Sequence, residues 1–303
     1  MSEVRAPKRP GGLVAEEWGS PSGTPVILIH GTPGSRNGPR PRFGVLYRLG
    51  IKLVSYDRPG YGGSTRSKGR TVADAAADVA AVADHFKMER FSVVGRSGGG
   101  PHALACATLL KDRVDRVAAL VSLAPPDAEG LHWYSEMTGT NVREYSQVDD
   151  DRSSMIARIV RQTAEIQDHP ERMLKMLQAE LTKPDQRVVE DVAIRKLLLE
   201  TYREALRAGP TGWIDDILAL SSPWGFDPAD ITVPTLLWHG ADDRFSPPGH
   251  TRWLAGRIPH AELHVMPGTS HFNAVEVLPD ILAWIKTGSY RPHALEPSGA
   301  GSR

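Results

Sequence analysis

One serine follows an apolar run and precedes three consecutive glycines, which marks it as a candidate nucleophile. Residues 93–100 read VVGRSGGG, so Ser97 lies in a G-x-S-x-G pattern. A strand that turns sharply into a helix strains the backbone at its apex, and the flanking positions tolerate the turn only without bulky side chains. We therefore expect the Ser97 hydroxyl to stand clear of the backbone. Gly98 would open the helix and present a free N–H toward developing negative charge.

Two other interpretations fit a glycine-rich turn of this kind. The turn can be purely structural, or it can bind a phosphate at the helix N-terminus. At this turn, however, the glycine spacings G-x-x-x-x-G-K-[ST] and G-x-G-x-x-G of nucleotide-binding loops are missing. A nucleotide site is therefore disfavoured, and the nucleophile hypothesis depends on whether suitable partners exist elsewhere in the chain.

A serine at its ordinary pKa needs a base, and the base needs a carboxylate to hold its tautomer. His271 lies in PGTSHFN at residues 267–273, just past the last apolar run. Asp243, with Asp242 beside it, lies in WHGADDRFSP at residues 238–247, just past the run before. The chain order serine, acid, histidine, with each residue in a loop after a strand, is the order typical of a catalytic triad on a parallel sheet.

The elements that must position these residues alternate between strand and helix. Apolar runs typical of buried strands occupy residues 25–30, 51–57, 90–95, 116–125, 233–240 and 261–268. Segments with helical periodicity occupy residues 71–86, 98–111 and 277–288. This alternation predicts an α/β fold with a mostly parallel central sheet and helices on both faces.

Residues 127–228 interrupt this alternation. The block contains helical segments and no strand candidate, and it is too long for a loop. We therefore predict an all-helical cap at residues 127–228, inserted into a core formed by residues 1–126 and 229–289. Residues 290–303 are predicted to be a disordered tail.

Composition and charge favour a small-molecule partner. The 36 basic and 36 acidic residues balance, so no global field attracts nucleic acid or an anionic membrane. No apolar run reaches the length of a membrane span, and the start of the chain is polar, which predicts a cytoplasmic protein. The chain has a single cysteine, Cys106, and no clustered spacing of metal-ligating residues. We therefore expect no internal disulfide, no metal and no cofactor. The sequence gives no basis for an oligomeric state.

The chain resembles a capped member of the α/β-hydrolase superfamily, in its esterase, haloperoxidase-like and proline-iminopeptidase-like branch. Five motifs carry the resemblance, in order HGTPGS, YDRPGYGGS, GRSGG, GADDRFSP and GTSH. It implies that Asp243 rather than Asp242 is the triad acid, with Asp127 as a further possibility, and that the backbone N–H of Thr32 pairs with that of Gly98 as an oxyanion hole. Epoxide hydrolases and haloalkane dehalogenases of this fold carry Asp where this chain has Ser97, so those activities are disfavoured.

Five further side chains are candidates for substrate contact: Arg96, Trp133, Trp213, Trp224 and Phe226. The alternative for Arg96 is burial against a nearby carboxylate, and the alternative for the aromatic residues is packing of the lid. Four arginines without an intervening acid follow the HGTPGS motif, namely Arg36, Arg40, Arg42 and Arg48. Such a run is usually a solvated surface, and the alternative is a basic rim that steers an anionic substrate. Asp57 and Arg58 are expected to form a structural ion pair or to cap a turn.

These observations predict a cofactor-free serine hydrolase that cleaves a small carboxylic ester, thioester or lactone through an acyl-enzyme. One alternative is an aminopeptidase resembling proline iminopeptidases, with lid acids drawn from Glu136, Glu144, Glu200 and Glu204. Another, of a different class, is a ligand-binding receptor or scaffold without catalytic activity.

Overall fold

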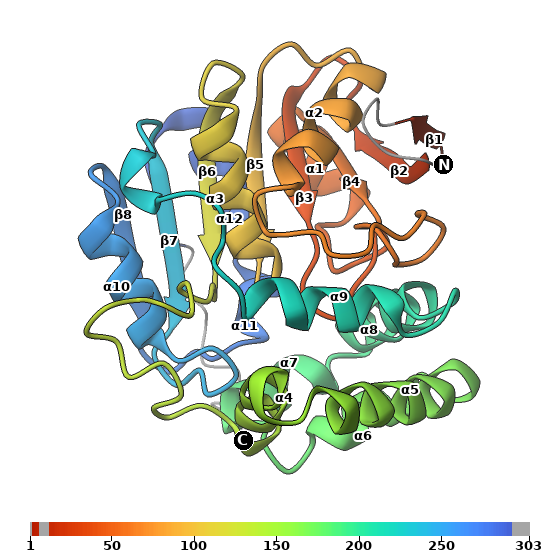
Figure 1. The fold of residues 1–303 in the computed structure, drawn as a ribbon. Helices are drawn as coiled ribbons and strands as arrows, with labels where there is room; N and C mark the ends of the chain where they lie inside the picture. The colour runs from red at the N-terminus through yellow and green to blue at the C-terminus, as the bar shows by residue number, and fades with distance from the viewer. Residues whose placement is uncertain (1, 6–11, 293–303) are drawn as a thin grey trace, which may run out of the picture.

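The computed structural model describes residues 2–5 and 12–292, and within them eight strands form one sheet with the order β1-β2-β4-β3-β5-β6-β7-β8 (Figure 1). The strands are β1 (Ser2–Arg5), β2 (Gly12–Gly19), β3 (Thr24–Ile29), β4 (Ile51–Tyr56), β5 (Phe91–Arg96), β6 (Val114–Leu120), β7 (Thr235–Gly240) and β8 (Ala261–Met266). β1 and β2 pair antiparallel, as do β2 and β4, and the other pairs are parallel. The predicted mostly parallel sheet is therefore confirmed.

Each of the predicted strands is present, and β1 and β2 are additional. The sequence of β2, GLVAEEWG, gives neither a continuous apolar run nor a strict alternation, and its burial follows no simple period of two. β2 borders β1 and β4, so its pairing is set by its neighbours more than by its own pattern.

Helices cover both faces of the sheet (Figure 1). On one face lie α2 (Ala75–His85), α3 (Gly99–Leu109) and α10 (Pro248–Arg257), and on the other lie α1 (Phe43–Leu49), α11 (Asn273–Glu276) and α12 (Leu278–Thr287). In β3, Ile27 and Ile29 pack into the first layer, whereas Val26 and Leu28 pack into the second. Residues 26–29 of β3 are apolar without alternation because both faces of the strand are buried.

The block between β6 and β7 is helical, as predicted. It contains α4 (Gly139–Asp150), α5 (Arg152–Asp168), α6 (Glu171–Leu177), α7 (Lys183–Glu190), α8 (Val192–Ala205), α9 (Thr211–Leu220) and the 3-10 turn η1 (Pro228–Asp230). We call α4 to α9 the helical insertion. In Figure 1 these helices lie together below the sheet, beyond the lower ends of its strands. The proposed domain boundaries remain a prediction.

Several boundaries differ from the sequence-based expectation. Residues 188–206 belong to two helices, α7 and α8, because Asp191 caps α8 by accepting hydrogen bonds from the backbone N–H groups of Ala193 and Ile194, both at 2.9 Å. α4 lies inside the predicted all-helical block, whereas α1 and α10 were not predicted. Of the predicted tail, residues 293–303 lie outside the described residues, while the Tyr290 ring packs 4.3 Å from that of His264. Across the described part of the chain, no helix is long and apolar enough to cross a bilayer.

Candidate active site

Ser97 occupies the sharp turn between β5 and α3. Its φ of 54° lies in the left-handed region, which costs a non-glycine residue free energy and is found where the surrounding structure enforces it. The enforcement comes from close packing of the start of α3 on β5 and on the end of β3. A Cβ on Gly95 would lie 2.2 Å from the Gly99 carbonyl oxygen, and one on Gly99 would lie 2.4 Å from that of Ile29. Both glycines are required by this contact.

His271 and Asp243 form a hydrogen-bonded pair at the ends of the neighbouring strands β8 and β7. His271 Nδ1 lies 2.8 Å from Asp243 Oδ2, while Asp243 Oδ1 accepts hydrogen bonds from the backbone N–H groups of Phe245 and Ser246. Burial alone raises the pKa of Asp243, but His271 and His239 outweigh it and hold that pKa well below its usual range. Asp243 is therefore a carboxylate fixed to accept the Nδ1 proton, which leaves Nε2 of His271 as the reactive nitrogen.

The other two candidate acids lie elsewhere. Asp242 and Asp127 are both exposed, and neither is hydrogen-bonded to His271. The exposed position of Asp242 follows from the turn after β7, which buries Asp243 and turns the preceding side chain outward. In this structure the carboxylate that contacts the imidazole is therefore that of Asp243.

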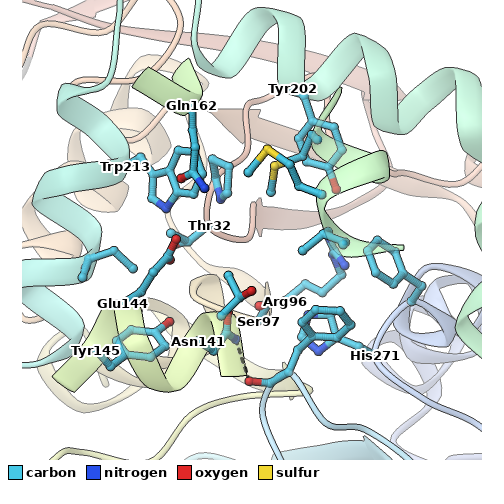
Figure 2. Close-up of a pocket in the computed structure, with 18 residues that line it drawn as sticks. Thr32, Arg96, Ser97, Asn141, Glu144, Tyr145, Gln162, Tyr202, Trp213 and His271 are labelled. Atoms are coloured by element: carbon cyan, nitrogen blue, oxygen red, sulfur yellow. Dashed lines mark hydrogen bonds between the residues drawn. The ribbon is translucent and has the colours of Figure 1, made fainter. Parts of the chain in front are cut away.

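Ser97 and His271 both line one cavity of about 260 Å³ between the sheet and the helical insertion (Figure 2). The structure has no hydrogen bond between the Ser97 hydroxyl and His271; catalytic hydrogen bonds are often long before substrate binds. The sheet side also contributes Thr32, Pro33, Arg96, Phe245 and Phe272, and the insertion contributes Thr140, Asn141, Glu144, Tyr145, Gln162, Met173, Met176, Leu177, Tyr202, Trp213 and Ile217. The helical insertion thus supplies most of the wall facing the serine.

Thr32 and Gly98, the two expected oxyanion donors, are packed together. A Cβ placed on Gly98 would lie 2.2 Å from Thr32 Oγ1. Neither of their backbone N–H groups donates to an acceptor among the described residues. Two unused N–H groups next to a serine are the arrangement that stabilises an oxyanion, provided that both point to the same place.

The Thr32 side chain is held by a buried ionic cluster. Thr32 Oγ1 donates to Asp216 Oδ2 at 2.5 Å, and Asp216 on α9 also binds Arg58, Arg70 and the Tyr61 hydroxyl. Burial alone raises the pKa of Asp216, but Arg58 and Arg70 outweigh it and lower that pKa well below its usual range. A residue of the insertion therefore fixes the loop that carries Thr32.

A second residue of the insertion, Asp185, holds the loop that carries His271. Asp185 is fully buried, and its carboxylate accepts hydrogen bonds from Ser270 Oγ at 2.7 Å and from the Phe272 backbone N–H at 2.9 Å. It also completes a capping box with Thr182 at the start of α7. The T-x-x-D spacing was a readable helix-start signal, but nothing in the sequence linked it to His271.

Glu144 on α4 places a buried carboxyl in the cavity wall. Burial raises its pKa to about 7, because Arg158, Trp213 and Arg143 compensate only in part. The group is therefore close to half protonated near neutral pH. Nearby, the Asn141 side-chain amide donates to the Phe245 carbonyl oxygen at 2.8 Å, which ties α4 to the loop after Asp243 (dashed line in Figure 2).

Two of the five candidate substrate-contact residues, Arg96 and Trp213, line the cavity. The other three do not, which corrects the expectation for them. Trp133 is buried, and its indole N–H donates to the Ala124 carbonyl oxygen at 3.0 Å. The rings of Trp224 and Phe226 stack with their centroids 5.6 Å apart, and neither ring lines the cavity. The sequence alone does not show which way these aromatic side chains point.

The arginine run is not one solvated surface, and it does not form a rim. Arg36 is buried and pairs with Asp57 and Glu204, and Arg40 stacks over the Trp18 ring at 4.2 Å. Arg42 and Arg48 are exposed. None of the four lines the cavity that contains Ser97.

Asp57 and Arg58 do not pair with each other: Asp57 binds Arg36, and Arg58 binds Asp216. The turn-capping alternative is confirmed for Asp57, whose carboxylate accepts hydrogen bonds from the backbone N–H groups of Arg36 and Gly63. Among the described residues, no group of three or more His, Cys, Asp or Glu side chains is arranged to hold a metal ion.

Comparisons with known proteins agree with this architecture. The chain is 27% identical over 282 residues to a non-heme haloperoxidase of Rhodococcus erythropolis, covering 90% of this chain and 95% of that protein. It is 28% identical over 282 residues to a bifunctional esterase/perhydrolase of Acinetobacter calcoaceticus, with the same coverage. A bromoperoxidase crystal structure from Bacillus anthracis superimposes with a TM-score of 0.70 at 21% identity, covering 94% of this chain and 99% of that one.

The alpha/beta hydrolase fold family matches residues 24–276, from the start of β3 to the end of α11. The match includes the Ser97 turn, the helical insertion, and the loops of Asp243 and His271. The chain belongs to the alpha/beta hydrolase fold family.

Proposed function

We propose that the protein is a serine hydrolase that cleaves a small carboxylic ester, thioester or lactone through an acyl-enzyme intermediate. One observation carries the proposal: Ser97, held at a positive φ, lines the same cavity of about 260 Å³ as His271, whose imidazole is hydrogen-bonded to Asp243. A cavity of this size fits a small substrate.

In the proposed reaction, Ser97 Oγ attacks the carbonyl carbon while His271 Nε2 accepts its proton. The backbone N–H groups of Thr32 and Gly98 stabilise the oxyanion, and each such donor contributes about 3 kcal/mol to the transition state. His271 then protonates the departing oxygen or sulfur. Water, deprotonated by His271, attacks the acyl-Ser97 ester and releases the acid. Asp243 stabilises the imidazolium in both halves of the cycle.

The test is labelling and turnover. The parent should react with a fluorophosphonate probe at Ser97 and hydrolyse p-nitrophenyl butyrate, and Ser97→Ala should lose both, with a rate loss of at least about 1,000-fold. Ser135→Ala, at an exposed serine of the same molecule, is the matched control. Equal turnover by Ser97→Ala and parent would contradict the proposal. A folded parent that neither labels nor turns over esters would favour the non-catalytic receptor.

An aminopeptidase is the second candidate function, and Glu144 is the observation that favours it. Its carboxyl lies in the same cavity as Ser97, where it can accept a hydrogen bond from a substrate amine. The two functions are separated by comparing the rates of cleavage of proline p-nitroanilide and of p-nitrophenyl esters under the same conditions. Faster cleavage of the anilide, lost in Glu144→Gln, would make this the primary activity.

A further inference from the structure

Arg96 is a guanidinium without a partner beside the proposed nucleophile. It precedes Ser97 in the chain, and its side chain lines the cavity. No carboxylate of the described residues forms an ion pair with it, and its Nη1 is buried with no hydrogen-bond acceptor. Arg96 is half-buried, whereas the buried arginines Arg36, Arg58 and Arg70 all have acidic partners. Arg96 is therefore the exception within the described core.

The surroundings of Arg96 do not neutralise its charge. Burial lowers the pKa of Arg96, with Tyr202 and Asp243 acting in the opposite direction. The Asp243 carboxylate is already hydrogen-bonded to His271 and to two backbone N–H groups. Figure 2 shows Tyr202, Arg96 and His271 toward one side of the cavity, and Glu144 and Trp213 toward the other. Glu144, the acidic side chain that lines the cavity, is thus on the side opposite Arg96.

A desolvated cation without an acceptor costs free energy that a bound anion would return. A carboxylate matches the planar fork of a guanidinium and accepts two parallel hydrogen bonds from it. Tyr202 adds a donor, because burial raises its pKa to about 12 and keeps its hydroxyl protonated at neutral pH.

We propose that Arg96, assisted by Tyr202, forms a carboxylate-binding subsite, so that the preferred substrates are esters that carry a free carboxylate close to the scissile bond. This inference rests on the proposed serine hydrolase activity and names its substrate class. The carboxylate can belong to the acyl part, as in a half-ester of a dicarboxylic acid, or to the leaving group. In either position it removes the unpaired charge of Arg96.

The experiment compares matched esters that differ in one charge. Monomethyl glutarate against methyl valerate tests a carboxylate on the acyl side, and 4-acetoxybenzoate against its methyl ester tests one on the leaving group. The parent should favour the charged member of one pair by about 10- to 100-fold in kcat/KM, as expected for a charge-assisted hydrogen bond. Arg96→Gln should abolish that preference, because it lowers kcat/KM for the charged ester at least about tenfold more than for its neutral partner.

Further variants keep the test decisive if Arg96→Gln folds poorly. Tyr202→Phe should reduce the preference several-fold, and Arg48→Gln, at an exposed arginine, should change neither the preference nor the turnover of neutral esters. In the parent, glutarate should inhibit cleavage of a neutral ester more strongly than methyl valerate does.

Each negative outcome points to a different conclusion. Equal kcat/KM for both members of both pairs in the parent, or an equal loss on charged and neutral esters in Arg96→Gln, would overturn the subsite. Retained turnover in Ser97→Ala would instead overturn the proposed function. A parent that labels at Ser97 and cleaves neutral esters without preference would refute only the subsite.

Discussion

At the scale of single residues, the glycines around Ser97 are set by contact distances rather than by flexibility. A methyl group at position 95 would meet the carbonyl oxygen of Gly99 at 2.2 Å and Ala103 Cβ at 2.7 Å, so α3 would have to move away from β5. Because Ser97 lies between these two elements, the same displacement would move its hydroxyl.

We therefore expect Gly95→Ala to destabilise the fold by about 1 to 3 kcal/mol, or more, and to remove esterase activity. Urea denaturation and turnover of p-nitrophenyl butyrate measure the two effects. Gly44→Ala is the control, because nothing lies within 4 Å of its added methyl group and alanine is the better helix former in α1. A stable, fully active Gly95→Ala would show that the packing of α3 on β5 does not hold the serine.

Glu144 gives a residue-scale prediction in the pH dependence of stability. Its pKa is about 7 in the folded protein, against an ordinary value of 4.5. The folded state therefore holds the proton more tightly, so this group stabilises the fold most below pH 4.5, and that stabilisation is lost as pH rises toward 7.

Glu144→Gln should remove that dependence, since it keeps the hydrogen-bonding shape without the charge. The parent's free energy of unfolding should fall, relative to that of the variant, by about 2 to 3 kcal/mol between pH 5 and pH 8. Urea titrations across this range measure the difference. Glu165→Gln, at an exposed position of α5, should follow the parent curve. Parallel curves for the parent and Glu144→Gln would mean that the carboxyl is not desolvated.

At the scale of elements, helix α7 positions the loop after β8. Asp185 accepts hydrogen bonds from both neighbours of His271, Ser270 and Phe272, while it caps its own helix. Removing this buried carboxylate leaves the Phe272 N–H without an acceptor and leaves the Ser270 hydroxyl only the Asp242 carbonyl oxygen at 3.2 Å. A buried donor without an acceptor costs about 1 to 3 kcal/mol.

Asp185→Ala should thus lower stability by about 2 to 4 kcal/mol and reduce kcat at least about tenfold, with a smaller change in KM, because the imidazole loses its position rather than the substrate its pocket. Asp191→Ala is the matched control: it also removes a helix-capping aspartate, at the start of α8, but makes no contact with the His271 loop. It should cost about 1 kcal/mol and leave kcat unchanged. Equal kcat effects in both variants would reduce Asp185 to a helix cap.

The elements that the sequence predicted are those whose burial leaves a direct pattern. β3 and β5 are buried on both faces, and each contains a run of adjacent apolar residues, VILI in β3 and VV in β5. β2 and α4 carry mixed patterns, GLVAEEWG and GTNVREYSQVDD, because neighbouring strands or helices decide which of their side chains are buried. Local pattern does not carry that information.

The same distinction applies to the candidate site. Ser97, Asp243 and His271 follow strands of a parallel sheet, whose carboxyl ends share one edge, so strand order alone places them near each other. The cavity wall comes from side chains of the insertion, whose direction depends on how its helices pack. Trp213 lines the cavity and Trp133 does not, although both are buried tryptophans of the same block. The ionic partner of Arg58 is Asp216 of the insertion, and the partner of Asp57 is Arg36. The sequence did not predict these pairs, because they depend on how the insertion and the loops pack.

At the scale of the whole molecule, the helical insertion is bound to the sheet by buried charges. Asp216 on α9 pairs with Arg58 and Arg70, which both belong to the core, and Glu204 on α8 pairs with Arg36. Breaking a buried pair by removing one partner leaves an uncompensated charge and typically costs about 3 to 5 kcal/mol. We therefore expect the insertion to unfold together with the sheet rather than as an independent domain.

Asp216→Asn tests this expectation, because the amide keeps the shape of the carboxyl but leaves Arg58 and Arg70 without their shared anion. The parent should unfold in one transition in urea, with α4 to α9 and the sheet losing protection from hydrogen exchange at the same urea concentration. In Asp216→Asn the midpoint should fall by an amount equivalent to about 3 to 5 kcal/mol, and the insertion should exchange before the sheet. Asp215→Asn, which removes the neighbouring pair with the partly exposed Arg66, should lower stability less than Asp216→Asn does and keep the single transition. Since the lowered pKa of Asp216 keeps it ionised at every pH above its ordinary value of 3.8, the difference between parent and Asp216→Asn should stay constant from pH 5 to pH 8. A parent whose insertion exchanges well before the sheet would show that these ion pairs do not couple the two parts, and that the wall of the cavity opens without disturbing Ser97.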